Sequence, residues 1–90
     1  MQVEFDGGKD ETNRRKHGIS LAAAAEMDFL RAQIIPDDRR DYGEARLWAV
    51  APIGGRLHVL TFTMRGEAMR AISLRKANAR ERRRYEQRSR

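Results

Sequence analysis

The sequence predicts a single α+β domain in which helices pack against one face of an antiparallel sheet. Three observations indicate this fold: segments in which apolar and polar residues alternate, segments with helical spacing, and short connections between the later strands. Because 90 residues suit one domain, it should occupy the whole chain, residues 1–90. The predicted order of elements is β-α-α-β-β-β-β-α.

The chain is predicted to start with a strand and a polar surface helix. Val3 and Phe5 alternate with polar neighbours, which predicts a strand over residues 2–6 with one buried face. The helix covers residues 9–17, with acidic side chains in its first turn and basic ones in its last, as the helix dipole favours. Gly18 follows where a left-handed residue commonly ends a helix.

A second helix and a short strand are predicted next. Ser20 is suited to cap the helix, and the alanine run at residues 22–25 extends it to about Leu30. A brief strand over residues 32–35 and a charged loop over residues 37–43 follow.

The remaining strands form predicted hairpins. Strands over residues 46–53 and 57–64 are joined through Gly54 and Gly55, which tolerate the positive φ of a tight turn. A last strand begins at Met69.

Alternation divides the side chains of that last strand between two faces. Ile72 and Leu74 should lie on one face and Ala71 on the other. The face shared with Ala71 is predicted to be polar and basic. Its polar residues are Thr61, Thr63, Arg65, Ser73 and Arg75.

The C-terminal stretch is an arginine-rich segment with helical spacing. Residues 65–90 carry a net charge of +7, whereas residues 1–64 carry −1. This one-sided excess indicates a surface that binds a polyanion, although an arginine run can also simply solvate a helix. The residues spaced along one helical face are Asn78, Glu81, Arg82 and Tyr85.

Composition argues against several other classes of protein. The chain has no cysteine, and its two histidines, His17 and His58, lie far apart, so no metal site or other cofactor is expected. No apolar run approaches the ~20 residues that span a membrane, and the N-terminus is acidic where a signal peptide would be apolar. We therefore expect a cytoplasmic protein without a membrane partner.

Several stretches, in order along nearly the whole chain, resemble the BrnT family of bacterial type II toxins. The matching residues are Phe5-Asp6, Lys9, Asn13, Lys16-His17-Gly18-Ile19-Ser20, Gly43-Glu44-Ala45-Arg46, Gly55-Arg56-Leu57, Thr63-Met64-Arg65-Gly66, Arg70 to Ala77, Glu81-Arg82 and Tyr85-Glu86. One departure is Phe5, at a place where members of the family often carry Trp shortly before the Asp.

The resemblance implies a fold similar to RelE toxins and a ribonuclease that arrests translation. It also implies a BrnA-like antitoxin partner, similar to ribbon-helix-helix DNA-binding proteins. Toxin and antitoxin together would repress their own operon, so contact with operator DNA would be indirect.

RNA cleavage by its own 2′-hydroxyl needs a base, a cationic clamp on the phosphate and an acid, and none of these roles requires a metal. Arg65, Arg75 and Arg82 are the candidate phosphate ligands, because guanidinium forks match phosphate oxygens. Glu81 is the candidate base, and Tyr85 the candidate acid or stacking platform. The candidate RNA-binding residues are Lys9, Lys16, His17, Arg70 and Lys76.

Each assignment has a structural alternative. Glu81 can simply pair with arginines, Tyr85 can anchor the last helix, and His17 can serve as a helix-terminal cation. His58 is expected to be a structural residue. Core packing is the expected role of Trp48, Phe62 and Phe29.

Two rival functions stay open beside the toxin. One is a non-catalytic RNA- or DNA-binding module, and the other is a plain interaction domain. Growth arrest on expression favours the toxin, and absence of nucleic-acid affinity at low salt favours the interaction domain.

Overall fold

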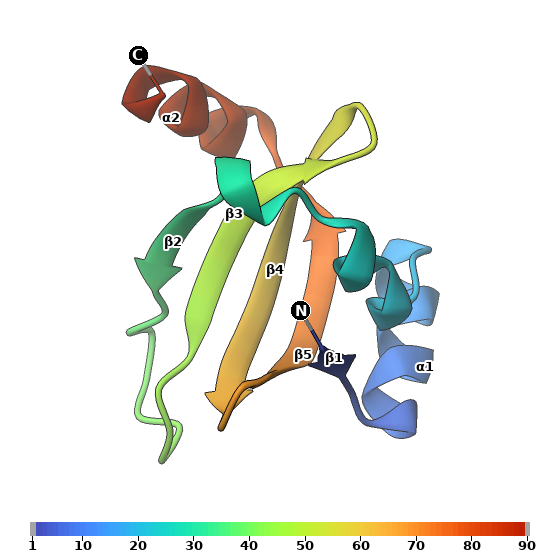
Figure 1. Cartoon of the computed structure of the whole chain (residues 1–90). Helices are drawn as coiled ribbons and strands as arrows, with labels where there is room; N and C mark the ends of the chain where they lie inside the picture. The colour runs from blue at the N-terminus through green and yellow to red at the C-terminus, as the bar shows by residue number, and fades with distance from the viewer. Residues whose placement is uncertain (1, 90) are drawn as a thin grey trace.

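The computed structural model describes residues 2–89 as one five-stranded sheet with helical segments around it (Figure 1). The strands are β1 (Val3–Glu4), β2 (Gln33–Pro36), β3 (Leu47–Ile53), β4 (Arg56–Arg65) and β5 (Ala68–Lys76). The helices are α1 (Gly7–His17), the 3₁₀ helices η1 (Leu21–Glu26) and η2 (Phe29–Arg31), and α2 (Ala79–Arg88). Among these described residues, no helix has the length and apolar character needed to cross a membrane.

The sheet is mixed, so the prediction of a wholly antiparallel sheet was wrong. Its strand order is β1-β5-β4-β3-β2, and the pairs from β2 to β5 are antiparallel as predicted. β1 instead joins the far edge and pairs in parallel with β5 at Met69 and Arg70. A two-residue strand has too little pattern to show which edge it joins, and α1 carries the chain away from it before any hairpin can form.

A bulge in β5 changes which side chains share a face. Thr61 pairs with Ser73 and the next residue, Phe62, pairs with Ala71, so Ile72 has no partner in β4. Ala71 therefore turns into the core, where it is buried, and the predicted grouping of Ala71 with Ser73 and Arg75 was wrong.

The predicted second helix is two short 3₁₀ helices. Leu21, Ala24 and Met27 are buried at intervals of three residues, which matches the three residues per turn of a 3₁₀ helix. Asp28 N–H then donates to Pro52 C=O at 2.9 Å, a bond to β3 that replaces continuation of the helix. Tertiary packing thus overrides the high α-helix propensity of the alanine run.

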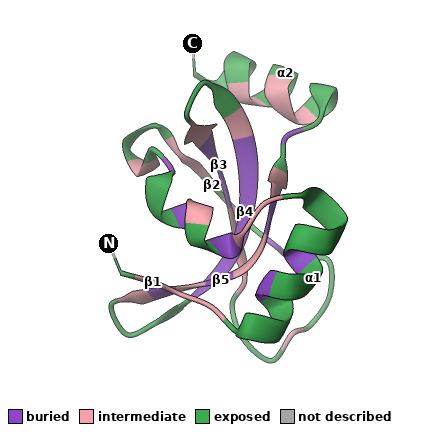
Figure 2. Ribbon diagram, turned by 90° about the vertical axis from the view of Figure 1, so that its right-hand side faces the viewer, coloured by how far each residue is buried: buried purple, intermediate pink, exposed green. Residues whose placement is uncertain are grey.

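Helical segments contact both faces of the sheet, which corrects the expectation that they cover one face. The main core lies between the sheet and η1, centred on Leu21, Leu60 and Leu74. A second, smaller cluster on the opposite face joins Val50 and Val59 to Tyr85 of α2. α1 has buried residues on its inner side, whereas α2 has none (Figure 2).

Candidate functional site

The centre of the candidate site is an ion pair between β5 and α2. Arg75 Nη1 donates to Glu81 Oε1 at 2.8 Å and Arg75 Nη2 donates to Oε2 at 2.9 Å. The second partner of Oε1 is the backbone N–H of Asn78, at 2.9 Å, in the capping box that begins α2. The bidentate pair fixes the plane of the guanidinium, and the Arg75 side chain remains 34% exposed.

The pair shifts the titration of both groups. Hydrogen bonds from Arg75 hold the pKa of Glu81 below its usual range, despite the opposing effect of burial. In turn, the bonds to Glu81 raise the pKa of Arg75. Both side chains therefore stay charged at neutral pH.

Arg75 lies on the face of the sheet that the sequence predicted to be polar, but this face also carries the smaller apolar cluster around Val50 and Val59. Arg75 lies beside Val59, and the next row on the same face joins Ser73, Thr61 and Trp48 across β5, β4 and β3. The bulge adds Arg70, which pairs with Thr63 and would otherwise face away from Arg75. Its guanidinium lies 3.8 Å from the Glu4 carboxylate of β1.

The remaining candidates on β4 and β5 lie farther out. Arg65 is exposed at the end of β4, on the same face as Thr63. Lys76 pairs with His58, so its side chain leaves the opposite face from Arg75.

Tyr85 and Arg82 of α2 both make local structural contacts. The Tyr85 hydroxyl donates to Arg31 C=O at 2.6 Å, and Tyr85 C=O accepts from Gln33 Nε2 at 2.9 Å, which ties α2 to β2 and η2. Arg82 donates to Ala77 C=O at 3.2 Å and lines a hollow beside the β3–β4 hairpin rather than the one shared by Glu81 and Tyr85.

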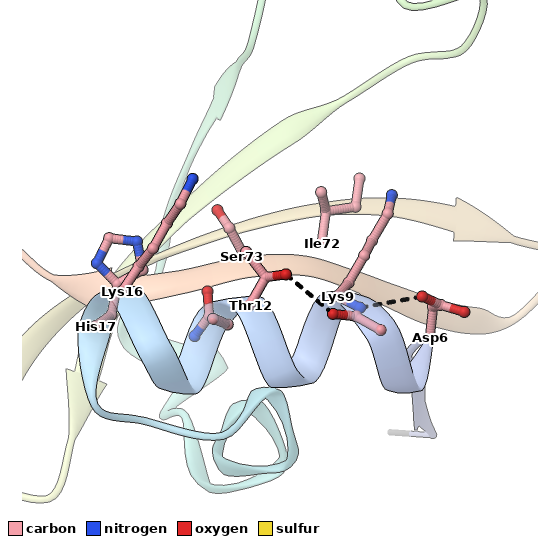
Figure 3. A pocket seen from close by; sticks show the side chains of 9 residues that line it. Asp6, Lys9, Thr12, Lys16, His17, Ile72 and Ser73 are labelled. Carbon is pink, nitrogen blue, oxygen red and sulfur yellow. Dashed lines mark hydrogen bonds between the residues drawn. The ribbon is translucent and has the colours of Figure 1, made fainter.

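A groove of about 380 Å³ runs between α1 and the edge of β5 (Figure 3). In Figure 3 the Lys9 and Lys16 side chains extend from the same side of α1 past β5, with Thr12 between them. His17 and Ser73 also line the groove. It therefore brings together three of the predicted RNA-binding residues and joins them, through Ser73, to the face that carries Arg75.

Asn13 fixes α1 against β5. Its amide donates to Leu74 C=O at 2.9 Å and accepts from Leu74 N–H at 2.9 Å, so it takes the place of a neighbouring strand. Because β1 and the start of α1 lie near Arg70 and Asn13 lies at Leu74, α1 runs along β5 in the same direction. Lys16 and His17, one turn beyond Asn13, are thus directed towards the Arg75 end of the strand.

Two residues of this region were missed by the sequence analysis. Arg84 lines the same small hollow as Glu81 and Trp48, and its charge helps lower the pKa of Glu81. Arg84 is three residues after Glu81, a spacing that puts both on one helical face, but the neighbouring arginines have similar spacings and nothing singles it out. Arg39 lies in the β2–β3 loop with its guanidinium 4.9 Å from the centre of the Trp48 ring. No local pattern marks it.

His58 and the aromatic residues Phe62, Trp48 and Phe29 lie in packed positions, as expected. His58 is buried, its Nδ1 lies 2.7 Å from Arg56 C=O, and it shares a face with Leu60. Phe62 is in the main core, and Trp48 and Phe29 pack at the edges of the two clusters. Within residues 2–89, no three His, Asp or Glu side chains gather as a metal-ligand group.

The site therefore combines oriented, partly exposed arginine side chains on one face of the sheet with a lysine-lined groove, in a small α+β domain suited to contact an anion. Residues 5–81 match the family model described as "Ribonuclease toxin, BrnT, of type II toxin-antitoxin system". The chain belongs to this BrnT family of ribonuclease toxins, and membership implies an RNA substrate and an antitoxin partner.

A solved structure supports the same assignment. The crystal structure of the Brucella abortus ribonuclease toxin BrnT is 30% identical in sequence, with a TM-score of 0.70 over 87% of this chain and 97% of that one. A comparison with curated proteins finds no match.

Proposed function

We propose that this protein is a metal-independent endoribonuclease that arrests translation by cleaving RNA on the Arg75 face of its sheet. The supporting observation is the Arg75–Glu81 pair, which holds the guanidinium of a partly exposed side chain in a fixed plane. A preorganised cation is suited to the charge that builds on phosphate oxygens during cleavage.

The reaction is an attack of the RNA's own 2′-oxygen on the adjacent phosphorus. The 2′-O–P bond forms and the P–O5′ bond breaks, which leaves a 2′,3′-cyclic phosphate and a 5′-hydroxyl. A base takes the 2′-proton and an acid supplies one to the 5′-oxygen. Arg75 neutralises the phosphate, and Arg65 and Arg82 remain further candidate phosphate ligands.

Glu81 is the proposed base, and binding of RNA would release its carboxylate from Arg75. In the free protein Arg75 occupies both carboxylate oxygens and lowers the pKa of the group, so Glu81 is a weak base. A phosphate that draws Arg75 away would free one oxygen and move the pKa back towards its usual value. Catalytic hydrogen bonds commonly rearrange in this way when substrate binds.

Tyr85 is the proposed acid or stacking platform, one helical turn beyond Glu81. As acid, its hydroxyl would have to exchange Arg31 C=O for the leaving oxygen. RNA would approach along the α1 groove over Lys9, Lys16 and His17, with Arg70 and Lys76 as outer phosphate contacts.

The partner we propose is a BrnA-like ribbon-helix-helix antitoxin, through which the toxin would meet operator DNA indirectly, in the bacterial cytoplasm. This rests on the resemblance of the sequence to the family. Co-expression with such an antitoxin should abolish growth arrest and yield a co-purifying complex; arrest that persists would contradict it.

The decisive experiment is RNA cleavage by purified protein, with and without a chelator, for wild type, Arg75→Ala and the control Arg88→Ala. We expect chelator-resistant cleavage that falls about 100-fold in Arg75→Ala and little in Arg88→Ala, the scale of losing a charge partner of the transition state. RNA binding without cleavage by the wild type would instead identify a non-catalytic module.

The pH dependence tests the role of Glu81. A base must be deprotonated, so activity falls as pH drops through its pKa. Because Arg75 lowers that pKa in the free protein, the acid limb of kcat/KM should lie at lower pH than that of kcat, which reports the RNA complex. Coincident limbs, or limbs that persist in Glu81→Gln, would remove Glu81 from this role.

A further inference from the structure

We propose that Arg39 is a second phosphate-binding guanidinium of this face, with Asp37 as its positioning residue, so that RNA spans the sheet from Arg75 to the β2–β3 loop. This rests on the proposed function and adds to it a contact on the same face of the sheet, beside the β2–β3 loop.

The Asp37 carboxylate holds Arg39 in a fixed orientation. Arg39 Nε donates to Oδ1 at 2.7 Å and Nη2 donates to Oδ2 at 2.9 Å. The Asp37 side chain is fully buried, whereas that of Arg39 is 61% exposed. The carboxylate thus binds Nε and Nη2 from beneath, and Nη1 is the nitrogen of the group that Asp37 leaves unbound.

Trp48 fixes Arg39 from a second direction. The guanidinium lies 4.9 Å from the ring centre, a cation–π distance, and Trp48 itself is held against the cluster of Val50 and Val59. A side chain as flexible as arginine normally loses conformational freedom when it binds, and these two contacts remove much of that freedom in advance.

Arg39 and Arg75 face the same space. Trp48 on β3 and Arg75 on β5 belong to neighbouring rows of one face, with β4 between them. Two strand spacings are about 10 Å, so one RNA strand lying across β4 can reach both residues. The positive charge of Arg39 acts to lower the pKa of Arg75, as expected for two cations on one surface.

Arg39 and Arg75 are held in the same way. The guanidinium of each is hydrogen-bonded to a carboxylate that is less exposed than the arginine, and part of each arginine side chain stays exposed on the same face of the sheet. The competing role for Arg39 is to fix the loop alone, in which case its loss would change stability without changing RNA affinity.

The probe is a fluorescently labelled, fully 2′-O-methylated single-stranded RNA, which lacks the attacking hydroxyl and therefore binds without being cleaved. We expect Arg39→Ala to weaken binding about tenfold and to reduce the slope of log K against log salt by about 0.7, the value for one phosphate contact. The matched control is Arg40→Ala, which removes the same charge one residue away, where the side chain stacks on Tyr42. Equal effects of the two variants would overturn the proposal.

Trp48 gives a second, independent readout because it is the only tryptophan of the chain. In the wild type its emission should change on RNA binding with the same midpoint as the labelled RNA. Emission that stays constant at saturation would also overturn the proposal.

Asp37→Asn separates orientation from charge. The substitution makes the protein more positive, so electrostatic attraction alone would tighten binding. If Asp37 orients Arg39, binding should instead weaken about threefold. A thermal unfolding transition checks that the variant is folded. Tighter binding would contradict the positioning role.

The experiments distinguish failure of the Arg39 proposal from failure of the proposed nuclease function. A wild type that binds the methylated RNA through Arg39 yet never cleaves unmodified RNA refutes the nuclease and leaves this inference standing. A wild type that cleaves with unchanged efficiency in Arg39→Ala, and binds equally well, refutes this inference alone.

Discussion

The two α-helices are both strongly polar, yet they are attached to the sheet in different ways. α1 is held by buried groups: Asn13, 3% exposed, replaces a strand partner at Leu74, and Asp10 accepts from the Leu21 N–H at 2.7 Å. α2 has no buried residue and is held by partly exposed contacts of Glu81 and Tyr85.

The difference indicates what each helix can contribute to function. Breaking the contacts of α1 would leave buried backbone groups without partners, which is costly, so α1 is a fixed wall of the groove. The contacts of α2 can open at little cost because water can replace them. The proposed release of Glu81 by substrate needs an attachment of this second kind.

The largest expected effect is on the attachment of α1. Asn13→Ala leaves the N–H and C=O of Leu74 unpaired in a buried place, so the free energy of unfolding should fall by about 3 kcal/mol. Urea denaturation measures it. The control Thr12→Ala removes an exposed hydroxyl bonded to Gly8 C=O and should change stability by less than about 0.5 kcal/mol. Equal effects would show that Asn13 is not the anchor.

A smaller effect is expected at the capping box of α2. Asn78→Ala removes the side-chain acceptor of the Glu81 N–H and should weaken the helix by about 1 kcal/mol. Because α2 lacks buried residues, the loss should be local: amides of α2 exchange hydrogen faster, while those of β4 do not. Faster exchange throughout the sheet would mean that α2 belongs to the same cooperative unit as the core.

The smallest expected effect is on the dependence of the unfolding free energy on acidic pH. The N–H of Leu21 lowers the pKa of Asp10, so this carboxylate stabilises the fold above its unfolded pKa of about 4. That stability is lost as pH falls through the lower, folded value. Asp10→Asn should flatten the dependence of unfolding free energy on pH below about 4, whereas Glu11→Gln controls for loss of an exposed charge. An unchanged slope in Asp10→Asn would contradict the linkage.

Much of the fold was predictable because its signals are local. The glycine turn at Gly54 and the left-handed cap at Gly18 depend on neighbouring residues alone, and both have the positive φ expected. Arg75 was predicted on the polar face from alternation along one strand. The bulge at Ile72 was not predictable, since it depends on how β5 matches β4.

The candidate site was predicted in part for the same reason. Glu81 and Tyr85 share a helical face by their spacing, but the sequence does not indicate that Arg75 would occupy both Glu81 oxygens. Arg39 was missed because its partner Trp48 lies across a loop, and charged loops are usually only solvated.

The sequence by itself determined the element order, the basic C-terminal region and membership of the BrnT family, because these depend on local periodicity, charge and motif order. Only the tertiary structure decided that β1 joins β5 in parallel, that the alanine run becomes 3₁₀ helix, and that Arg39 and Arg75 share one face. These depend on contacts between residues distant in the chain, whose energies no local pattern encodes.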